Sequence, residues 1–132
     1  MKLLLDTHFV VWLTQAPDRL RPREIALLRQ SNVEICVSAL AIWELRLKWA
    51  KRHPSGARKG DLDAAAVFGF LRGTGWELVD LSVTDAAAEL EHPVRHNDPF
   101  DEQLLIQAQQ LGARLLTRDE RLRDHPLAWR FT

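Results

Sequence analysis

The stretch KLLLDTHFVVWLTQ, residues 2 to 15, opens with a short apolar run that ends at an aspartate. Its opening apolar run is too short for a helix and is stopped by a polar residue, which predicts a buried strand over residues 2–5. A helix is expected directly afterwards, over residues 7–15. Asp6 stands between the two elements. Because an unpaired carboxylate next to a buried strand is costly, we expect a cationic group to meet Asp6.

The same alternation of short apolar runs and amphipathic segments continues along the chain. Further strands are expected at residues 33–37, 76–82 and 113–117, and residues 127–131 are a candidate for a fifth. Helices are expected at residues 21–30, 39–52, 61–75, 85–91 and 99–111, with Thr84 as the cap of the fourth. Strands that alternate with helices predict an α/β fold, with a mainly parallel central sheet of four to five strands flanked by helices.

Size and composition narrow the class of protein. The chain has 132 residues, of which 46% are hydrophobic, and this is typical of one domain spanning residues 1–132. Lysine plus arginine (18) equals aspartate plus glutamate (18), which excludes binding of nucleic acid through bulk positive charge. The single cysteine, Cys36, excludes an internal disulfide. No run approaches the ~20 apolar residues of a membrane span, so we expect a soluble, cytoplasmic protein without a membrane partner.

The charges are distributed unevenly along the chain. Residues 45–60 contain no acid, and their basic side chains include Arg46, Lys48, Lys51 and Arg52. Residues 77–102 are acidic, with Arg95 as the only arginine or lysine. This asymmetry indicates one anionic partner, for which the four basic residues named are the candidate binding groups, and one cationic partner or ion. Two solvated faces of opposite charge are the alternative interpretation.

Five acids fall near the expected ends of strands. Asp6 ends the first strand, Glu44 lies in the second turn of the helix after the second strand, and Asp119 follows the fourth strand. Asp98 and Asp101 open the helix that precedes the fourth strand. Ligands of open parallel sheets gather beyond the carboxyl ends of the strands, so these acids are candidates for one site. Oxygen ligands without clustered histidine or cysteine favour Mg²⁺ or Mn²⁺ over zinc.

Each acid except Asp6 also has a local interpretation. Asp98, followed by Pro99, has the pattern of a helix N-cap, and Asp101 stands where a capping box would place an acid. Glu44 and Lys48 have the spacing of an ion pair on an exposed helix. Asp119 is placed to cap a short helix over residues 120–124. Both interpretations stay open from spacing alone.

Carboxylate-held Mg²⁺ activates water and stabilises the charge that develops on a phosphoryl group. A basic segment beside such a site would hold a polyanion by its backbone. The combination predicts cleavage of phosphodiester bonds in nucleic acid.

Four segments in this order, LLLDTHFVVWL, SALAIWELRLKWA, HNDPFDEQLLIQAQ and LLTRDERL, resemble the PIN-domain ribonucleases, and specifically the VapC-type toxins of bacterial type II toxin–antitoxin pairs. The resemblance implies a three-layer PIN-like fold and an endoribonuclease that depends on Mg²⁺, for which Mn²⁺ substitutes. It also implies an RNA substrate, a cognate antitoxin that neutralises the toxin, and a homodimer. The residues carried over are Asp6, Glu44, Asp101 and Asp119 as metal-binding catalytic acids, Asp98 as an additional acid, and Thr7 and Thr117 as supporting hydroxyls.

Three other functions compete with this one. The first is an RNA-processing PIN nuclease without a toxin role. The second is a non-catalytic binding module whose acids only cap helices and pair with Arg46, Arg118 or Arg121. The third is a phosphoacceptor receiver domain, which needs an aspartate at the end of a middle strand and a lysine after the last, and the segments CVSAL and LLTRD provide neither.

Overall fold

The computed structural model describes residues 1–50 and 63–131. Its sheet consists of β1 (Lys2–Leu5), β2 (Glu34–Ser38), β3 (Glu77–Val79) and β4 (Arg114–Leu116), in the order β3-β2-β1-β4. All three pairings are parallel. β1 lies inside the sheet, where Leu4 is in register with Cys36 of β2 and with Leu115 of β4. The predicted α/β fold with a parallel sheet is confirmed.

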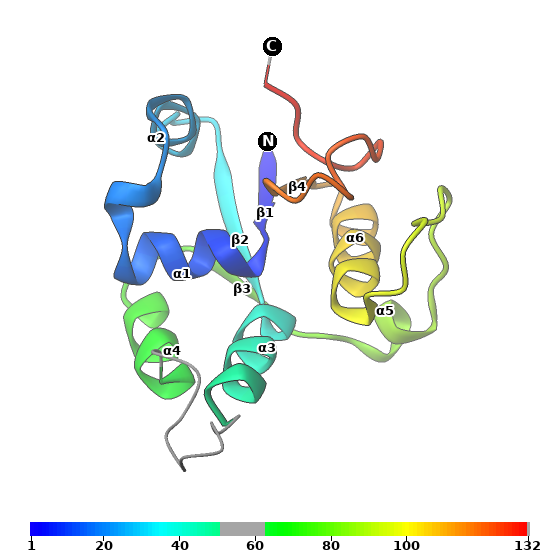
Figure 1. Ribbon diagram of the computed structural model, residues 1–132, viewed down its shortest axis with the longest axis horizontal. Helices are drawn as coiled ribbons and strands as arrows, with labels where there is room; N and C mark the ends of the chain where they lie inside the picture. Colours follow the sequence, from blue (N-terminus) through cyan, green and yellow to red (C-terminus); the bar gives the residue numbers. More distant parts are fainter. Residues whose placement is uncertain (51–62, 132) are drawn as a thin grey trace.

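Helices cover both faces of this sheet (Figure 1). α1, α2 and α4 lie on one side of it, and α5 and α6 lie on the other. The helices are α1 (Thr7–Gln15), the short 3-10 helix η1 (Pro17–Arg19), α2 (Pro22–Leu28), α3 (Ala39–Ala50), α4 (Ala64–Arg72), α5 (Val83–Ala87) and α6 (Pro99–Leu111). The sheet is therefore the middle one of three layers, with helices on either side.

The apolar run of β1 explains why both faces are covered. Successive strand residues point to opposite faces, and each of Leu3, Leu4 and Leu5 is fully buried. Leu3 and Leu5 belong to the core under α1, α2 and α4, whereas Leu4 packs in the core formed with α6. A strand buried on both faces reads as a continuous apolar run rather than an alternating one.

Two local expectations were wrong. Residues 127–131 form no strand; only Ala128 makes an isolated parallel bridge to Leu115. The segment binds β4 at that single point, because Leu115 donates to the carbonyl of Leu127 and accepts from the amide of Trp129 before the chain leaves the sheet. The short helix expected at residues 85–91 is α5, which begins at Val83 with Ser82 as its cap, not Thr84.

The remaining helix boundaries shift by small amounts. α3 ends at Ala50, and the predicted continuation to residue 52 lies outside the described residues. α4 starts at Ala64, after Asp63 caps it through a hydrogen bond from the Ala65 amide. Among the described residues, no helix combines the length and the apolar character that crossing a bilayer requires.

Cys36 is buried in β2. Burial raises the pKa of its thiol to about 12, with the neighbouring Glu77 contributing in the same direction. The thiol therefore stays protonated at neutral pH, as expected for a small core residue without a nucleophilic role.

Candidate functional site

Asp6 is a buried acid with a hydrogen-bond partner at each carboxylate oxygen. It caps α1, since Oδ1 accepts a hydrogen bond of 2.7 Å from the amide of His8, and Oδ2 accepts one of 2.6 Å from the hydroxyl of Thr117. Only 6% of the residue is exposed. Burial raises the pKa of Asp6 above its ordinary value, the charge of Glu44 adds to this, and the contacts with Thr117 and His8 oppose it. A nearby cation would favour the charged form of this carboxyl.

Thr117 connects Asp6 to Asp119. Its hydroxyl donates to Asp6 and accepts a hydrogen bond of 3.1 Å from the amide of Asp119. The backbone supports the same juxtaposition, because the amide of Asp6 donates to the carbonyl of Leu116 at the end of β4. The carboxyl ends of β1 and β4 thus bring Asp6 and Thr117 into contact, and Asp119 follows Thr117 by two residues.

Asp119 and Asp101 share an arginine. Nη2 of Arg121 lies 2.8 Å from Oδ2 of Asp119 and 3.5 Å from Oδ2 of Asp101. Nε of Arg121 adds a hydrogen bond of 3.1 Å to Oδ1 of Asp119. These hydrogen bonds hold the pKa of Asp119 below its ordinary value. A guanidinium therefore stands between two of the acids expected to bind an ion.

Asp101 has a second partner in His96. Nε2 of His96 lies 2.9 Å from Oδ2 of Asp101, and both side chains are mostly shielded from solvent. Burial raises the pKa of Asp101, the contact with His96 opposes the shift, and the charges of Asp98 and Asp119 reinforce it. Asp98, Asp101 and Asp119 therefore lie close enough for their charges to interact.

Asp98 caps α6, as its position before Pro99 predicted. Its Oδ1 accepts hydrogen bonds from the amides of Phe100 (2.9 Å) and Asp101 (3.3 Å). Asp101 itself points away from the capping box that was considered for it, toward His96 and Arg121. The question whether Asp98 is a cap is settled, and whether it also binds an ion stays a prediction.

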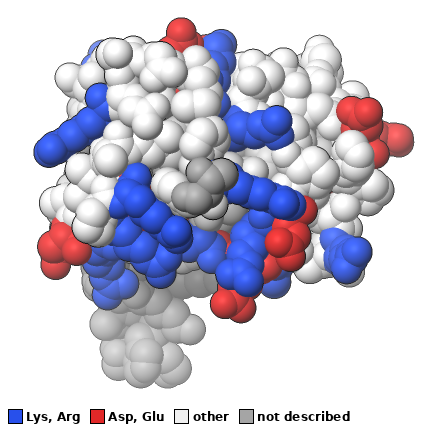
Figure 2. Space-filling view, turned by 90° about the horizontal axis from the view of Figure 1, so that it is seen from above, with Lys and Arg blue, Asp and Glu red and all other residues white. Residues whose placement is uncertain are grey.

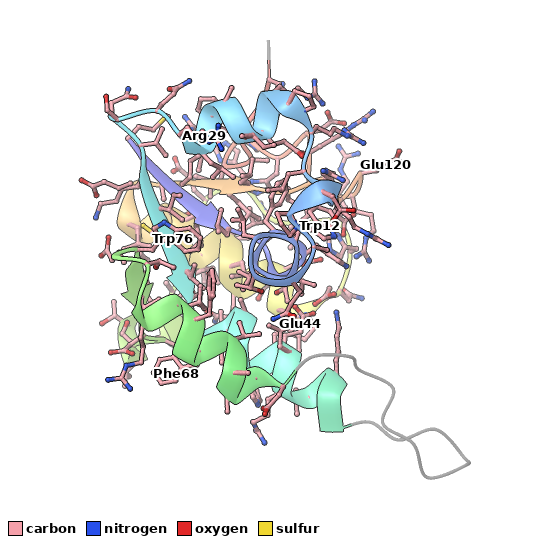
Figure 3. The ribbon with its side chains drawn as sticks, turned by 90° about the vertical axis from the view of Figure 1, so that its left-hand side faces the viewer. Trp12, Arg29, Glu44, Phe68, Trp76 and Glu120 are labelled. Atoms are coloured by element: carbon pink, nitrogen blue, oxygen red, sulfur yellow. The ribbon has the colours of Figure 1, made fainter. Side chains whose placement is uncertain are left out.

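Glu44 lies on α3 next to α1 (Figure 3). Its Oε2 is 3.4 Å from Nζ of Lys48, which confirms the pair expected from their spacing. The carboxyl is largely shielded, with 17% of its side chain exposed against 47% for Lys48. Glu44 is therefore mostly shielded from solvent, and its charge acts on Asp6 although its immediate partner is the lysine.

Asp119 does not cap a helix. The chain after it forms a turn, in which the amides of Leu122 and Arg123 donate to the carbonyl of Asp119 and the amide of Arg121 donates to its carboxylate. This turn is what places the side chain of Arg121 back over Asp119.

The acids fall into two groups by the charges that act on them. Asp6 and Glu44 make the first, and Asp98, Asp101 and Asp119 make the second. Among the residues that the structure describes, no set of three or more aspartate, glutamate, histidine or cysteine side chains is arranged to hold a metal ion. Arg121 provides positive charge within the second group.

The chemistry of these residues nevertheless fits a hard divalent ion. Every candidate ligand is an oxygen, which Mg²⁺ and Mn²⁺ prefer. The guanidinium of Arg121 shows that the second group accepts a cation between its carboxylates. Beside Asp6, the hydroxyl of Thr7 is buried and has no hydrogen-bond partner within the described residues. A buried hydroxyl oxygen without a hydrogen-bond partner is a further candidate ligand for an ion beside Asp6.

The basic residues expected to bind a polyanion are described only in part. Arg46 is exposed on α3, and Lys48 pairs with Glu44. Lys51 and Arg52 lie outside the described residues. Sequence reasoning missed the roles of His96 and of Arg121, the latter considered only as a partner in a non-catalytic module. It also missed a group of arginines near α2.

Comparisons with known proteins agree with this architecture. A family model described as "PIN domain" matches residues 3–126. A chain of the crystal structure of VapBC2 from Rickettsia felis, bound to a DNA fragment from its promoter, superposes with a TM-score of 0.65. The match covers 97% of the present chain and 96% of that chain, at 18% sequence identity, and so shows a shared fold. No curated protein matches the sequence.

Proposed function

The chain belongs to the PIN-domain family, and from this premise we propose that it is a Mg²⁺-dependent endoribonuclease toxin of the VapC type, neutralised by a cognate antitoxin. One observation carries the proposal. The buried carboxyl of Asp6, at the end of β1, is held by Thr117 at the end of the adjacent parallel strand, two residues before Asp119. This is the edge at which open parallel sheets bind their ligands.

The proposed ligands of the ion are Asp6, Glu44, Asp101 and Asp119, with Asp98 as an additional acid. When bound, Mg²⁺, or Mn²⁺ in its place, supplies an activated water and stabilises charge on the phosphate. The protein's own groups orient the acids. Thr117 fixes one oxygen of Asp6, and His96 fixes one oxygen of Asp101. Thr7 is proposed as a supporting hydroxyl.

RNA is the proposed substrate, with Arg46, Lys48, Lys51 and Arg52 as candidate contacts to its backbone. An antitoxin and a second copy of the chain are the proposed protein partners. Large apolar side chains exposed on α3 and α4 support contact with protein: Trp43 is 46% exposed and Phe70 51%. Exposed apolar side chains of this size are candidates for such contacts.

Cleavage of RNA by the purified protein tests the proposal. We expect total RNA to be cut in Mg²⁺, and cleavage to stop in EDTA and in Asp6→Asn, a variant that retains an N-cap side chain for α1. Sequencing the fragment ends identifies the site. Undiminished cleavage in EDTA, or full activity of Asp6→Asn, would contradict the proposal.

Expression in bacteria separates a toxin from an RNA-processing nuclease of the same fold. A toxin is expected to arrest growth unless Asp6 is replaced by Asn, and co-expression of a protein encoded by a small open reading frame next to its gene is expected to restore growth. Metal-dependent cleavage without growth arrest would favour the processing nuclease.

A further inference from the structure

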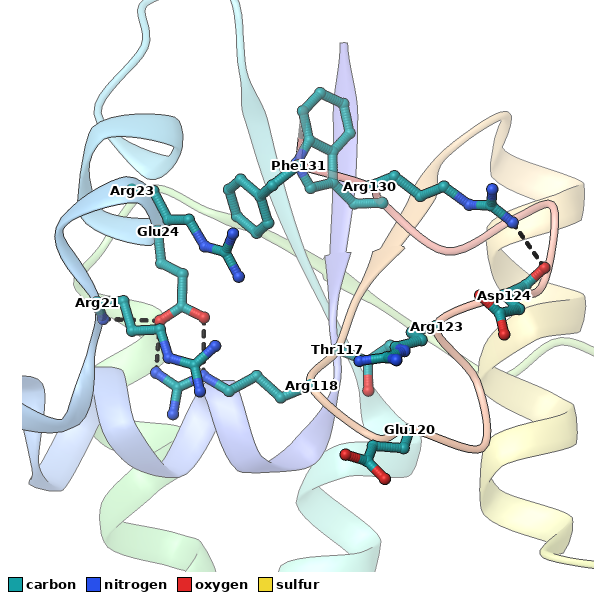
Figure 4. Close-up of a pocket in the computed structure, with 11 residues that line it drawn as sticks. Arg21, Arg23, Glu24, Thr117, Arg118, Glu120, Arg123, Asp124, Arg130 and Phe131 are labelled. Carbon is teal, nitrogen blue, oxygen red and sulfur yellow. Dashed lines mark hydrogen bonds and ion pairs between the residues drawn. The ribbon is translucent and has the colours of Figure 1, made fainter.

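A pocket of about 340 Å³ lies between α2, the segment after β4 and residues 129–131 (Figure 4). Five of its lining residues are arginines, from three separate parts of the chain: Arg21, Arg23, Arg118, Arg123 and Arg130. Figure 2 shows the molecule from above, with lysine and arginine side chains gathered on that face. The sequence spacing of these arginines gives no signal of a shared site, since the fold alone brings them together.

One of the arginines is committed to an internal acid. Nε of Arg118 lies 2.8 Å from Oε2 of Glu24, whose Oε1 accepts a hydrogen bond of 2.7 Å from the amide of Arg21. Glu24 is 1% exposed. Burial acts to raise the pKa of Glu24, but the contacts with Arg118 and Arg21 outweigh it and hold that pKa below its ordinary value. The pair is therefore a neutral, structural part of the wall.

The other four arginines keep their charge available. Among the described residues, no carboxylate lies within ion-pair distance of Arg21, Arg23, Arg123 or Arg130. Arg130 donates to the backbone carbonyl of Asp124, which leaves its charge uncompensated. Because the remaining acids of the lining are Glu120 and Asp124, the pocket has an excess of positive charge. An excess of positive charge favours an anionic ligand.

Aromatic rings line the same pocket. The guanidinium of Arg23 lies over the Phe131 ring, with its carbon 4.6 Å from the ring centre. Trp129 and Phe131 pack edge to face at 6.3 Å. The indole N–H of Trp129 is buried and has no hydrogen-bond partner within the described part of the chain. Arginines for phosphates beside aromatic rings for bases are the combination that binds single-stranded nucleic acid.

The pocket adjoins the candidate catalytic site through Thr117 and Arg118. Thr117 lines it, and the same hydroxyl donates to Asp6. Arg118 lines the pocket and Asp119, the next residue, belongs to the acidic site. A nucleic acid strand whose phosphate reaches the acids would therefore run into the arginine pocket within a short distance.

We propose that the arginine pocket binds single-stranded RNA on one side of the bond to be cut, with the four uncommitted arginines contacting phosphates and the Trp129–Phe131 pair contacting a base. This inference rests on the proposed ribonuclease function and identifies where its substrate lies. The pocket is separate from the basic segment around Arg46, which lies on α3. An acidic protein segment would satisfy the charges but would leave the aromatic rings and the connection to the acids without a purpose.

Binding of a fluorescein-labelled single-stranded RNA oligonucleotide, measured by anisotropy, tests the proposal. All proteins carry Asp6→Asn and are kept in EDTA, so that binding is measured without cleavage. The test variant is the double charge reversal R23E/R130E, and the matched control is R29E/R72E, which reverses two exposed arginines outside the pocket. Arg118 is left intact because its loss would leave the buried carboxylate of Glu24 without its ion-pair partner.

We expect R23E/R130E to weaken binding by at least about tenfold and to lower the slope of log K against log salt by roughly 1.4, since each phosphate contact on a single strand contributes about 0.7. The affinity of the control is expected to stay within about twofold of the parent. It makes the same change in net charge, but outside the pocket, where salt screens its effect on the RNA. Melting curves establish that both variants fold. If R23E/R130E does not fold, the neutral variants R23Q and R130Q carry the same comparison, each with a several-fold loss.

Equal affinities of R23E/R130E and R29E/R72E would overturn the proposal. Cleavage by versions that keep Asp6 separates the two hypotheses. If R23E/R130E cuts RNA like the parent while Asp6→Asn does not, the pocket proposal fails and the ribonuclease stands. If the parent cuts no RNA but R23E/R130E still loses RNA binding, the pocket stands and the ribonuclease fails. Retained RNA binding with loss of binding to the antitoxin would instead assign the pocket to a protein and overturn the proposal.

Discussion

At the scale of single residues, the site is governed by which partner each carboxylate has. Asp6 is buried against two hydrogen-bond donors, whereas Asp119 is paired with Arg121. The roles of Asp6 and Asp98 as residues at an element boundary were predictable, because both depend on immediate neighbours in sequence. The contact between His96 and Asp101 was not, because it depends on how the turn before α6 folds back.

The raised pKa of Asp6 predicts a stability cost in the metal-free protein. A carboxyl whose pKa is raised on folding lowers the free energy of unfolding once the pH rises above its unfolded pKa of about 3.9. This loss of stability grows until the pH passes the folded pKa, and it is complete above that pH. Asp6→Asn removes this loss and keeps the cap of α1. We expect Asp6→Asn to melt higher than the parent at pH 7 in EDTA, with the difference vanishing below pH ~4. A lower melting temperature at pH 7 would contradict this account.

Arg121 predicts competition with a bound cation. Its guanidinium contacts Asp119 and Asp101, so an ion that uses these oxygens must displace it. We expect Arg121→Gln to bind Mn²⁺ several-fold more tightly than the parent. The affinity is obtained from the rise of the melting temperature with Mn²⁺ concentration. Arg95→Gln, on the neighbouring exposed loop, serves as the control for lost charge. Weaker Mn²⁺ binding by Arg121→Gln would assign the arginine a supporting role instead.

At the level of helices and strands, the sequence predicted an element correctly where all the residues that determine it lie next to one another in the chain. β1 followed from its apolar run, and α6 from Asp98 and Pro99. The start of α5 was misplaced because Ser82 and Asp85 form the capping box, a pattern that competes with Thr84. The fifth strand was wrong because an apolar segment also packs against a sheet without pairing along it.

The cap of α6 can be separated from any role of Asp98 toward an ion. Asp98→Ala is expected to lower the free energy of unfolding by about 1 kcal/mol, and Asp98→Ser, which keeps a capping oxygen, to restore most of it. Urea denaturation measures both. If both variants lose the same stability, the capping interaction is not what Asp98 contributes. RNA cleavage by the stable Ser variant then reports whether the second oxygen of Asp98 is needed as well.

The pair of Glu24 and Arg118 joins α2 to the segment after β4, and its two halves are unequal. Removing Arg118 leaves a carboxylate that is 1% exposed, whereas removing Glu24 leaves a guanidinium that is 24% exposed. We expect Arg118→Ala to cost about 3 kcal/mol of unfolding free energy and Glu24→Gln about half as much, because the cost of an unpaired charge grows with its burial. Chemical denaturation of both variants checks the order. A larger loss for Glu24→Gln would contradict it.

At the scale of the whole molecule, the order of the strands determines the site. The sequence predicted that strands are parallel but not that β4 lies beside β1, and it is this neighbourhood that joins Asp6 to Thr117 and Asp119. Strand order depends on contacts between residues more than a hundred positions apart, for which local pattern carries no information. The arginine pocket is a product of the same packing, because α2 and the segment after β4 meet only in the folded chain.

The proposed ribonuclease needs acids from separate parts of the chain to meet at one edge of the sheet and bind a divalent ion there. Crystals grown with Mn²⁺, with the ion located by its anomalous scattering, would show whether they do. We expect Mn²⁺ bonded to an oxygen of Asp6 and to at least one of Glu44, Asp101 and Asp119, with Arg121 turned away. Crystals in which Asp119 stays paired with Arg121 and Mn²⁺ is absent from Asp6 would contradict it.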